Sequence, residues 1–117
     1  TEYFFTSRIE AEMVKSAQNT MLAARVALAN VIFDACKSCG VDYEIIKKIA
    51  FDSFDLIGPS MVQVPGPDGN QGFGGKCLPK DIRAFSSIFS SRILNEIIKY
   101  NDSLRDDLEQ QLVNFKK

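Results

Sequence analysis

SRIEAEMVKSAQNTMLAARVALANVIFDACKSCG, residues 7–40, carries the signals of a single long helix. Ser7 and Glu10 have the Ser-x-x-Glu spacing of a capping box, in which each side chain satisfies a backbone donor that helix formation leaves free. Apolar side chains then recur every three or four residues until Gly40, which suits the turn after a helix. The stretch therefore predicts a helix of about 30 residues, roughly 45 Å long.

This helix is expected to be apolar on more than one side. One set of apolar residues follows the helical spacing along its whole length: Ile9, Met13, Ala17, Met21, Ala24, Leu28, Val31 and Ala35. A second face carries Leu22, Val26 and Ala29. Such a helix needs more apolar covering than this chain supplies. Part of its surface is a candidate for a partner subunit or another domain; alternatively, the chain's own shorter helices wrap around it.

Shorter elements are expected on either side of this helix. Asp42 can cap a helix that runs to about Phe51, with Ile45, Ile46 and Ile49 facing inward. Before the long helix, residues 3–5 could form a short extended piece.

The second half of the chain predicts a loop and two more helices. Residues 58–76 are rich in proline and glycine without periodicity, and ordered loops of this length are usually functional. Pro79 suits the first turn of a helix that runs to about Phe89. After Ser91 an amphipathic helix of about 25 residues is expected. Its apolar positions are Ile93, Ile97, Tyr100, Leu104, Leu108, Leu112 and Phe115. The predicted fold class is all-α.

Composition narrows the possible functions. At 117 residues with 45% hydrophobic side chains, the chain fits one domain, residues 1–117. Its 14 basic and 15 acidic residues nearly cancel, so we expect neither nucleic acid nor a membrane as partner. No segment approaches the roughly 20 apolar residues that span a bilayer, and the expectation is a cytoplasmic protein.

The cysteine and histidine counts restrict the chemistry. Three cysteines fit a reducing compartment better than a disulfide framework. The chain has no histidine, the commonest metal ligand and general base, so we expect no metal site and chemistry on cysteine, lysine or carboxylates. Cys36 and Cys39 have Cys-x-x-Cys spacing without a second pair, and they are interpreted as small helix-packing residues.

The segment with the most chemical information is VPGPDGNQGFGGKCLPKD, residues 64–81. Cys77 follows a glycine-rich loop and stands just before a predicted helix, where free amides, the helix dipole, Lys76 and Lys80 all favour the thiolate. Cys77 is therefore the best nucleophile in the chain. Spacing alone leaves open a plain glycine turn with a buried cysteine. The glycines are not a dinucleotide fingerprint, because that motif needs a preceding strand.

Two motifs resemble the UDP-glucose/GDP-mannose dehydrogenase family. Residues 72–81, Gly-Phe-Gly-Gly-x-Cys-x-Pro-Lys-Asp, resemble its active-cysteine signature, and residues 11–20 resemble the Ala-Glu-x-x-Lys-x-x-x-Asn opening of its central helix. The resemblance covers essentially the whole chain and implies the family's central dimerisation domain. The implied fold is a long central helix packed by shorter helices, like the C-terminal domain of 6-phosphogluconate dehydrogenase. The family's NAD-binding and nucleotide-binding domains are not part of these 117 residues.

The resemblance also implies a reaction. A sugar C6 alcohol would be oxidised to a carboxylate while two NAD are reduced, through a thiohemiacetal and then a thioester on Cys77. Lys15 and Asn19, one helical turn apart, would hold an oxyanion or a water. Asp81 would hydrogen-bond Lys15 or the hydrolytic water. UDP-glucose is the expected substrate, because the Pro-Gly-Pro-Asp-Gly loop resembles that branch of the family.

Further roles follow from the same resemblance. Phe73, Gly74 and Gly75 would bind substrate, Lys80 would lie near the cofactor edge, and the long helix would form a homodimer. Without the resemblance, the charged and amide groups would be read as solvated surface side chains.

Two departures leave the substrate contacts across the dimer open. Leu56 stands where many relatives have arginine, and Met61 where they often have histidine. The alternative function is a non-catalytic helical oligomerisation module derived from the same family.

Overall fold

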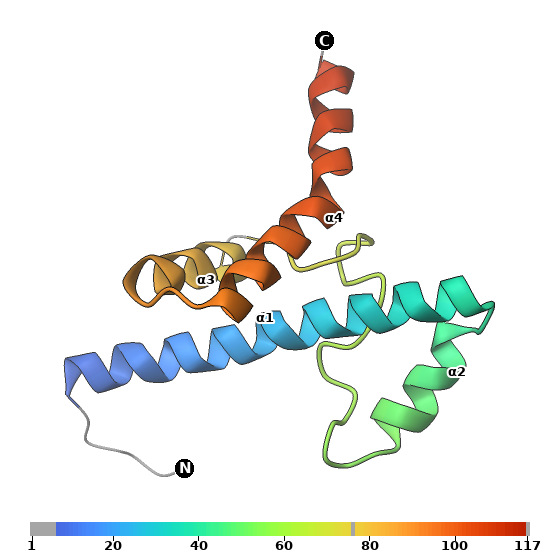
Figure 1. Ribbon diagram of the computed structural model, residues 1–117, viewed down its shortest axis with the longest axis horizontal. Coiled ribbons are helices and arrows are strands. Elements are labelled where there is room, and N and C mark those ends of the chain that lie inside the picture. The colour runs from blue at the N-terminus through green and yellow to red at the C-terminus, as the bar shows by residue number, and fades with distance from the viewer. Residues whose placement is uncertain (1–6, 76, 117) are drawn as a thin grey trace.

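All regular structure in the described part of the chain is helical. A computed structural model describes residues 7–75 and 77–116, with the side chains of 77 and 106–116 left aside. Its elements are α1 (Arg8–Cys39), α2 (Tyr43–Lys47), the π-helical turn η1 (Lys48–Asp52), α3 (Cys77–Ile88) and α4 (Arg92–Lys116) (Figure 1). The all-α prediction is confirmed. The possible extended piece at residues 3–5 lies outside the described residues.

The long helix begins and ends where the sequence predicts. The Ser7 hydroxyl accepts a hydrogen bond from the Glu10 amide (3.1 Å), and the Glu10 carboxylate accepts one from the Ser7 amide (3.2 Å). At the other end, Gly40 adopts the left-handed conformation (φ 71°), which a glycine does without steric cost. The 32 residues of α1 make a helix about 48 Å long at 1.5 Å per residue.

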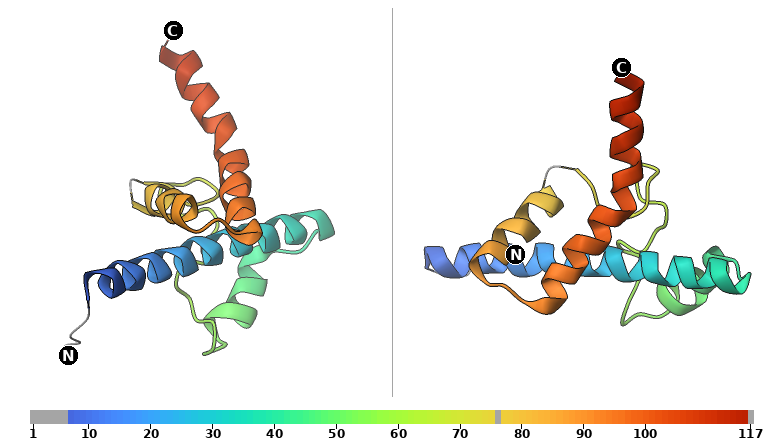
Figure 2. Two further views of the ribbon diagram at one scale, coloured as in Figure 1. Left: turned by 60° about the vertical axis from the view of Figure 1, so that its left-hand side comes forward. Right: turned by 45° about the horizontal axis from the view of Figure 1, so that its top comes forward.

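The other elements pack along α1 at two places. In Figure 1, α3 and the first half of α4 lie beside its middle, whereas α2 packs near its C-terminal end. The second half of α4 points away from the other helices in all three views (Figures 1 and 2). One core cluster contains Ala29, Cys36, Tyr43, Phe51, Val62 and Val64; the other contains Ala23, Val26, Phe73, Ile82 and Leu94. The second cluster anchors the loop that precedes Cys77.

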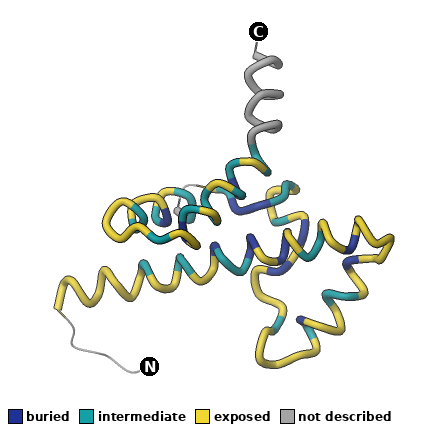
Figure 3. Tube along the Cα trace, in the orientation of Figure 1, coloured by how far each residue is buried: buried dark blue, intermediate teal, exposed yellow. Residues whose placement is uncertain are grey.

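Among the residues that the structure describes, the chain's own helices cover only one face of α1. The buried residues are mainly small: Ala23, Val26, Ala27, Ala29, Asn30 and Cys36. Small side chains let neighbouring backbone approach closely, whereas the larger Met13, Met21 and Leu28 remain exposed. Figure 3 shows that the first turns of α1 are mostly exposed. The described shorter helices of the chain therefore do not cover the apolar set that starts at Ile9.

The inward face of the second helix was predicted wrongly. Ile45 and Ile49 are exposed, and only Ile46 of the three isoleucines packs against the core. Tyr43 and Phe51 fill that space instead, and the Tyr43 hydroxyl donates a hydrogen bond to the Val62 carbonyl. The π-helical turn η1 follows α2 directly and does not keep the residue spacing of an α-helix. The periodicity of an uninterrupted α-helix therefore misplaces these side chains.

The last two helices confirm their predicted bounds but not every buried position. Pro79 is the third residue of α3, and the break at Ser90–Ser91 precedes α4. Ile93 is exposed, whereas Leu94 is buried, so the apolar stripe is wrong at its start. Of its other members, Leu108, Leu112 and Phe115 lie where side chains are not described. None of the helices described is long and apolar enough to cross a membrane.

Candidate functional site

Cys77 is the first residue of helix α3, whereas the sequence predicted it just before the helix. Lys76 and the Cys77 side chain lie outside the described residues, so activation of the thiol stays a prediction. Position 81 lies four residues further along α3, one helical turn away, and the two positions share a face of the helix. The surroundings of Asp81 therefore define the neighbourhood of the proposed nucleophile.

Three of the predicted site residues meet beside the start of α3. The Asn19 side-chain amide donates a hydrogen bond to Asp81 Oδ2 (2.6 Å), and Lys15 Nζ lies 4.0 Å from the same oxygen. Lys15 and Asn19 come from successive turns of α1. Asp81 is partly buried, whereas the Lys15 side chain is 74% exposed. The structure thus brings an ammonium, an amide and a carboxylate together, and the hydrogen bond between Asn19 and Asp81 joins positions 62 residues apart.

The glycine loop, residues 72–75, is held by two buried asparagines. The Phe73 amide donates to Asn101 Oδ1 (2.7 Å), and Asn101 Nδ2 donates back to the Phe73 carbonyl (2.9 Å). The Gly72 amide donates to Asn30 Oδ1 (3.2 Å). Sequence reasoning assigned neither asparagine a role. The available signal was a polar side chain among apolar neighbours on the packed face of a long helix, where it needs a hydrogen-bond partner.

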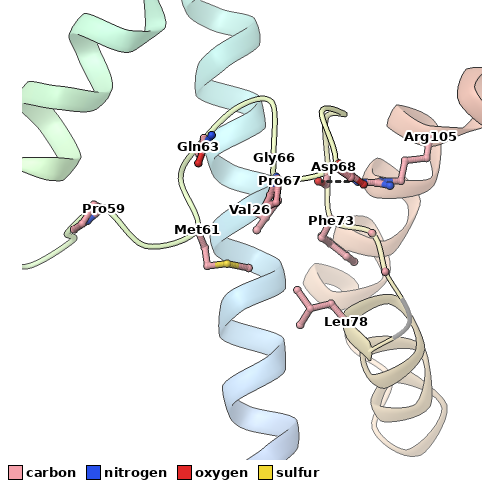
Figure 4. A pocket seen from close by; sticks show the side chains of 13 residues that line it. Val26, Pro59, Met61, Gln63, Gly66, Pro67, Asp68, Phe73, Leu78 and Arg105 are labelled. Atoms are coloured by element: carbon pink, nitrogen blue, oxygen red, sulfur yellow. Dashed lines mark hydrogen bonds and ion pairs between the residues drawn. The ribbon is translucent and has the colours of Figure 1, made fainter.

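A cavity of about 360 Å³ lies between α1, residues 59–68 and the glycine loop (Figure 4). The predicted substrate-binding residues Phe73, Gly74 and Gly75 all line it. Its remaining wall is mostly apolar, from Val26, Pro59, Met61, Pro67 and Leu78. An ion pair between Asp68 and Arg105, with 3.0 Å between Oδ2 and Nη2, closes one end. The cavity therefore joins an apolar wall to exposed loop backbone and charged groups.

The other singled-out residues lie apart from this group or at its edge. Lys80 is exposed on α3, and it makes no hydrogen bond or ion pair with another described residue. Leu56 is 87% exposed, whereas Met61 lines the cavity in a left-handed conformation (φ 61°) that favours glycine. Cys36 is buried, as a packing residue should be, but Cys39 is exposed, so the packing interpretation is wrong for Cys39. Cys39 is the last residue of α1, where its neighbours Ser38 and Gly40 are exposed as well.

Comparison with known proteins identifies the family to which the chain is similar. The sequence profile described as "UDP-glucose/GDP-mannose dehydrogenase family, central domain" matches residues 9–103. The UDP-glucose 6-dehydrogenase of Rickettsia bellii is 35% identical over 106 residues, which are 86% of this chain and 23% of that protein. For the UDP-glucose 6-dehydrogenase AglM of Haloferax volcanii the identity is 35% over 99 residues, 80% of this chain and 21% of that protein.

A more distant relative is similar over the same region. The UDP-glucose 6-dehydrogenase TuaD of Bacillus subtilis is 29% identical over 114 residues, 92% of this chain and 23% of that protein. The chain thus spans less than a quarter of the length of these relatives. No solved structure matches the chain significantly, so the likeness to the C-terminal domain of 6-phosphogluconate dehydrogenase stays a prediction. The profile match and the identities show that the chain belongs to the UDP-glucose/GDP-mannose dehydrogenase family and corresponds to its central domain.

Proposed function

We propose that this chain is the central domain of an NAD-dependent nucleotide-sugar 6-dehydrogenase that oxidises UDP-glucose or a related nucleotide sugar to the uronate. The main support is the meeting of Lys15 and Asn19 with Asp81, one turn beyond Cys77. An exposed lysine 4.0 Å from a carboxylate contributes little to stability, so packing does not require this arrangement. A role in the reaction is a better reason for it.

In this proposal Cys77 carries the covalent chemistry. Its thiolate adds to the carbonyl carbon of the aldehyde intermediate and forms a thiohemiacetal. When the hydride has left that carbon, a thioester remains, and water releases the carboxylate and returns the thiol. Lys15 and Asn19 would stabilise the oxyanion that forms at each addition. Asp81 would orient both side chains and the attacking water through its carboxylate.

NAD would accept the two hydrides, and most of its binding site would lie outside this chain. The described residues form no strand and hence no βαβ unit of the kind that binds a dinucleotide. Lys80 is the one residue here proposed to lie near the cofactor, and its exposure on α3 leaves it free to meet another domain. The nucleotide of the substrate would likewise be held mainly by a domain that flanks this one.

The sugar end of the substrate is proposed to occupy the cavity beside the glycine loop. Loop backbone at Gly74 and Gly75 offers polar groups, and glycine lets a ligand approach closely. The Phe73 backbone is already bonded to Asn101, so Phe73 would contribute its side chain. Met61 contributes a flexible apolar side chain to the wall opposite this backbone. Leu56 precedes Met61 in the sequence and is exposed. It would contact a neighbouring subunit through an apolar side chain and not through a charged one.

A homodimer through α1 is part of the proposal. The uncovered face of α1 carries large apolar side chains: Ile9, Met13, Met21, Leu28 and Val31. A groove of about 410 Å³ between α1 and α4 continues it, lined by Leu28, Val31, Ile93 and Ile97 among others. Apolar surface of this kind on a polar chain is typical of a protein interface. The same face supports the second candidate function, a non-catalytic oligomerisation module. For either function we propose a reducing compartment such as the cytoplasm.

The deciding experiment expresses the complete open reading frame that contains this chain. We expect NADH to form when UDP-glucose and NAD are supplied, with two NADH for each UDP-glucose consumed. Cys77→Ser should abolish uronate formation, and Lys15→Met should lower kcat by about 10²-fold or more. The chain on its own should reduce no NAD. A complete protein without activity on any nucleotide sugar, which still forms a dimer, would favour the oligomerisation module.

A further inference from the structure

One side chain of α4, Arg105, reaches two separate parts of the long loop. Its Nη2 donates a hydrogen bond to Asp68 Oδ2 (3.0 Å) and another to the Gly72 carbonyl (3.1 Å). The side chain is 16% exposed. One guanidinium group thus joins the turn at residues 66–70 to the start of the glycine loop.

Asp68 is arranged to receive this contact. Its Oδ1 accepts a hydrogen bond from the Asn70 amide (3.0 Å), which leaves Oδ2 for Arg105. The turn is closed by the Gly69 amide, which donates to the Gly66 carbonyl (2.9 Å). Burial acts to raise the pKa of Asp68, but the hydrogen bonds from Asn70 and Arg105 outweigh it and hold the pKa below its usual value. The pair is therefore ionised at neutral pH.

Gly74 and Gly75 are glycines for different reasons. Gly75 has a φ of +82°, which other residues rarely adopt, and a Cβ there would meet nothing within 4 Å. Gly74 is outside this left-handed region, so its backbone does not require glycine. A Cβ at Gly74 would overlap Nη1 of Arg105 and lie 2.7 Å from its Cζ. The guanidinium group therefore packs directly against the Gly74 backbone, and a side chain at position 74 would have to displace it.

Stability alone does not explain this arginine. Its Nε is buried and has no hydrogen-bond partner among the residues that the structure describes. Leaving a buried donor unpaired destabilises the folded chain, which offsets part of what the two Nη2 hydrogen bonds contribute. Arg105 also borders two cavities, the one of about 360 Å³ beside α1 and one of about 540 Å³ between α3 and α4.

We propose that Arg105 is a positioning residue, which fixes the glycine loop against the Asp68 turn and so sets where α3, and with it Cys77, begins. The loop forms a wall of both cavities, through Gly74 and Gly75. A shift of this wall would change the space beside the nucleophile. The consequence for Cys77 rests on the proposed function, whereas the contact between Arg105 and Gly74 can be tested without it.

The first test is a double-mutant cycle between positions 74 and 105. Gly74→Ala should push the Arg105 guanidinium group off the loop, and the loop, no longer joined to Asp68, should exchange its Gly72 and Phe73 amides about tenfold or more faster. In an Arg105→Ala background the added methyl group finds room, so Gly74→Ala should change exchange much less. Gly75→Ala is the matched control: its Cβ meets nothing, so its strain should be the same in both backgrounds. Additive effects of Gly74→Ala and Arg105→Ala would overturn the proposed contact.

The second test separates positioning from general stabilisation. In a Cys36→Ser, Cys39→Ser background, the alkylation rate of Cys77 is measured with iodoacetamide. Arg105→Ala should change this rate by about threefold or more while exchange in the core of α1 stays unchanged. Arg105→Lys should restore part of the rate, since an ammonium can reach Asp68 or the Gly72 carbonyl but not both.

A matched control uses the other arginine at the second cavity. Arg83 pairs with Asp102 and makes no hydrogen bond to the glycine loop, so Arg83→Ala should leave the Cys77 rate unchanged. Uniformly faster exchange along the whole chain in Arg105→Ala would mean that Arg105 is only structural, and would overturn the proposal. A Cys77 that reacts no faster than Cys39 in the unsubstituted chain would instead contradict the proposed function, and the cycle at position 74 would still report on Arg105.

Discussion

The two ends of the segment 72–81 are held in opposite ways. At its start, Asn30 and Asn101 are almost completely buried and hold loop backbone through three hydrogen bonds. At its far end, Asp81 is held by a partly buried amide and by a lysine that is mostly exposed. Buried hydrogen bonds decide whether a chain folds, whereas exposed charges contribute little to stability. The comparison indicates that the loop is fixed by its start and that the groups near α3 are free to serve chemistry.

The largest effect on stability is expected at Asn101. Asn101→Ala removes both hydrogen bonds to Phe73 and leaves a buried amide and a buried carbonyl without partners. The free energy of unfolding should fall by about 2–4 kcal/mol, measured by urea denaturation. Asn101→Asp keeps an acceptor for the Phe73 amide but buries a carboxylate against the Phe73 carbonyl, so it should cost no less than alanine. A loss below about 0.5 kcal/mol for Asn101→Ala would show that the start of the loop is not held as described.

A smaller loss is expected at Asn30. Its side chain accepts from the Gly72 amide and donates to the Val26 carbonyl within α1, which is already part of the helix ladder. Asn30→Ala therefore leaves one buried donor without a partner and should cost about 1–3 kcal/mol. Asn30→Asp keeps the acceptor but buries a carboxylate beside the Val26 carbonyl, so it should cost no less than alanine. If Asn30→Ala cost more stability than Asn101→Ala, Asn101 of α4 would not be the residue that contributes most to holding the glycine loop.

The ion pair at Asp68 should give a modest pH dependence. Its pKa is lower in the folded chain than the ordinary value of 3.8, so its contribution to stability is present above that value and is lost as the pH falls through the folded pKa. Asp68→Asn should therefore be less stable than the unsubstituted chain at pH 7, by less than about 1 kcal/mol because the carboxylate is partly exposed. Thermal unfolding between pH 7 and pH 2 should show this difference shrink below pH 4. A constant difference over that range would contradict it.

The smallest effect on stability is expected at Lys15. Lys15→Met removes an exposed charge 4.0 Å from Asp81 and should change the free energy of unfolding by less than about 0.5 kcal/mol. The same substitution in the complete open reading frame should cause a large loss of turnover. Lys99→Met is a matched control, because Lys99 is an exposed lysine paired with Glu96 on the surface of α4. Equal activity losses for both lysines would remove the distinction between the two ends of the segment.

Local features of the fold could be predicted from the sequence, and contacts over long distances could not. The capping box at Ser7, the glycine after α1 and the first turn at Pro79 depend on neighbouring residues, so their patterns are sufficient. Ile45 and Ile49 were placed wrongly because nothing in the local pattern signals the π-helical turn. The asparagine contacts join residues 42 and 28 positions apart, and periodicity carries no information about such pairs.

In the candidate site too, local features could be predicted from the sequence and long-range contacts could not. Cys77 could be singled out from its place between a glycine-rich loop and a helix, because those features are adjacent in the sequence. The family resemblance paired Asp81 with Lys15 or the hydrolytic water, whereas the structure gives Asp81 a hydrogen bond from Asn19 and leaves Lys15 4.0 Å away. Arg105 was missed because a charged residue on an amphipathic helix looks like a solvated one.

The most direct measurement of the central claim is the pH dependence of alkylation at each of the three cysteines, followed by mass spectrometry. The chain supplies its own references, since Cys36 is buried and Cys39 is exposed. We predict that Cys77 reacts fastest at pH 7 and that its rate follows a pKa below about 8.5, the ordinary value for a thiol. A Cys77 that reacts no faster than Cys39, with a pKa at or above that value, would contradict its role as the nucleophile.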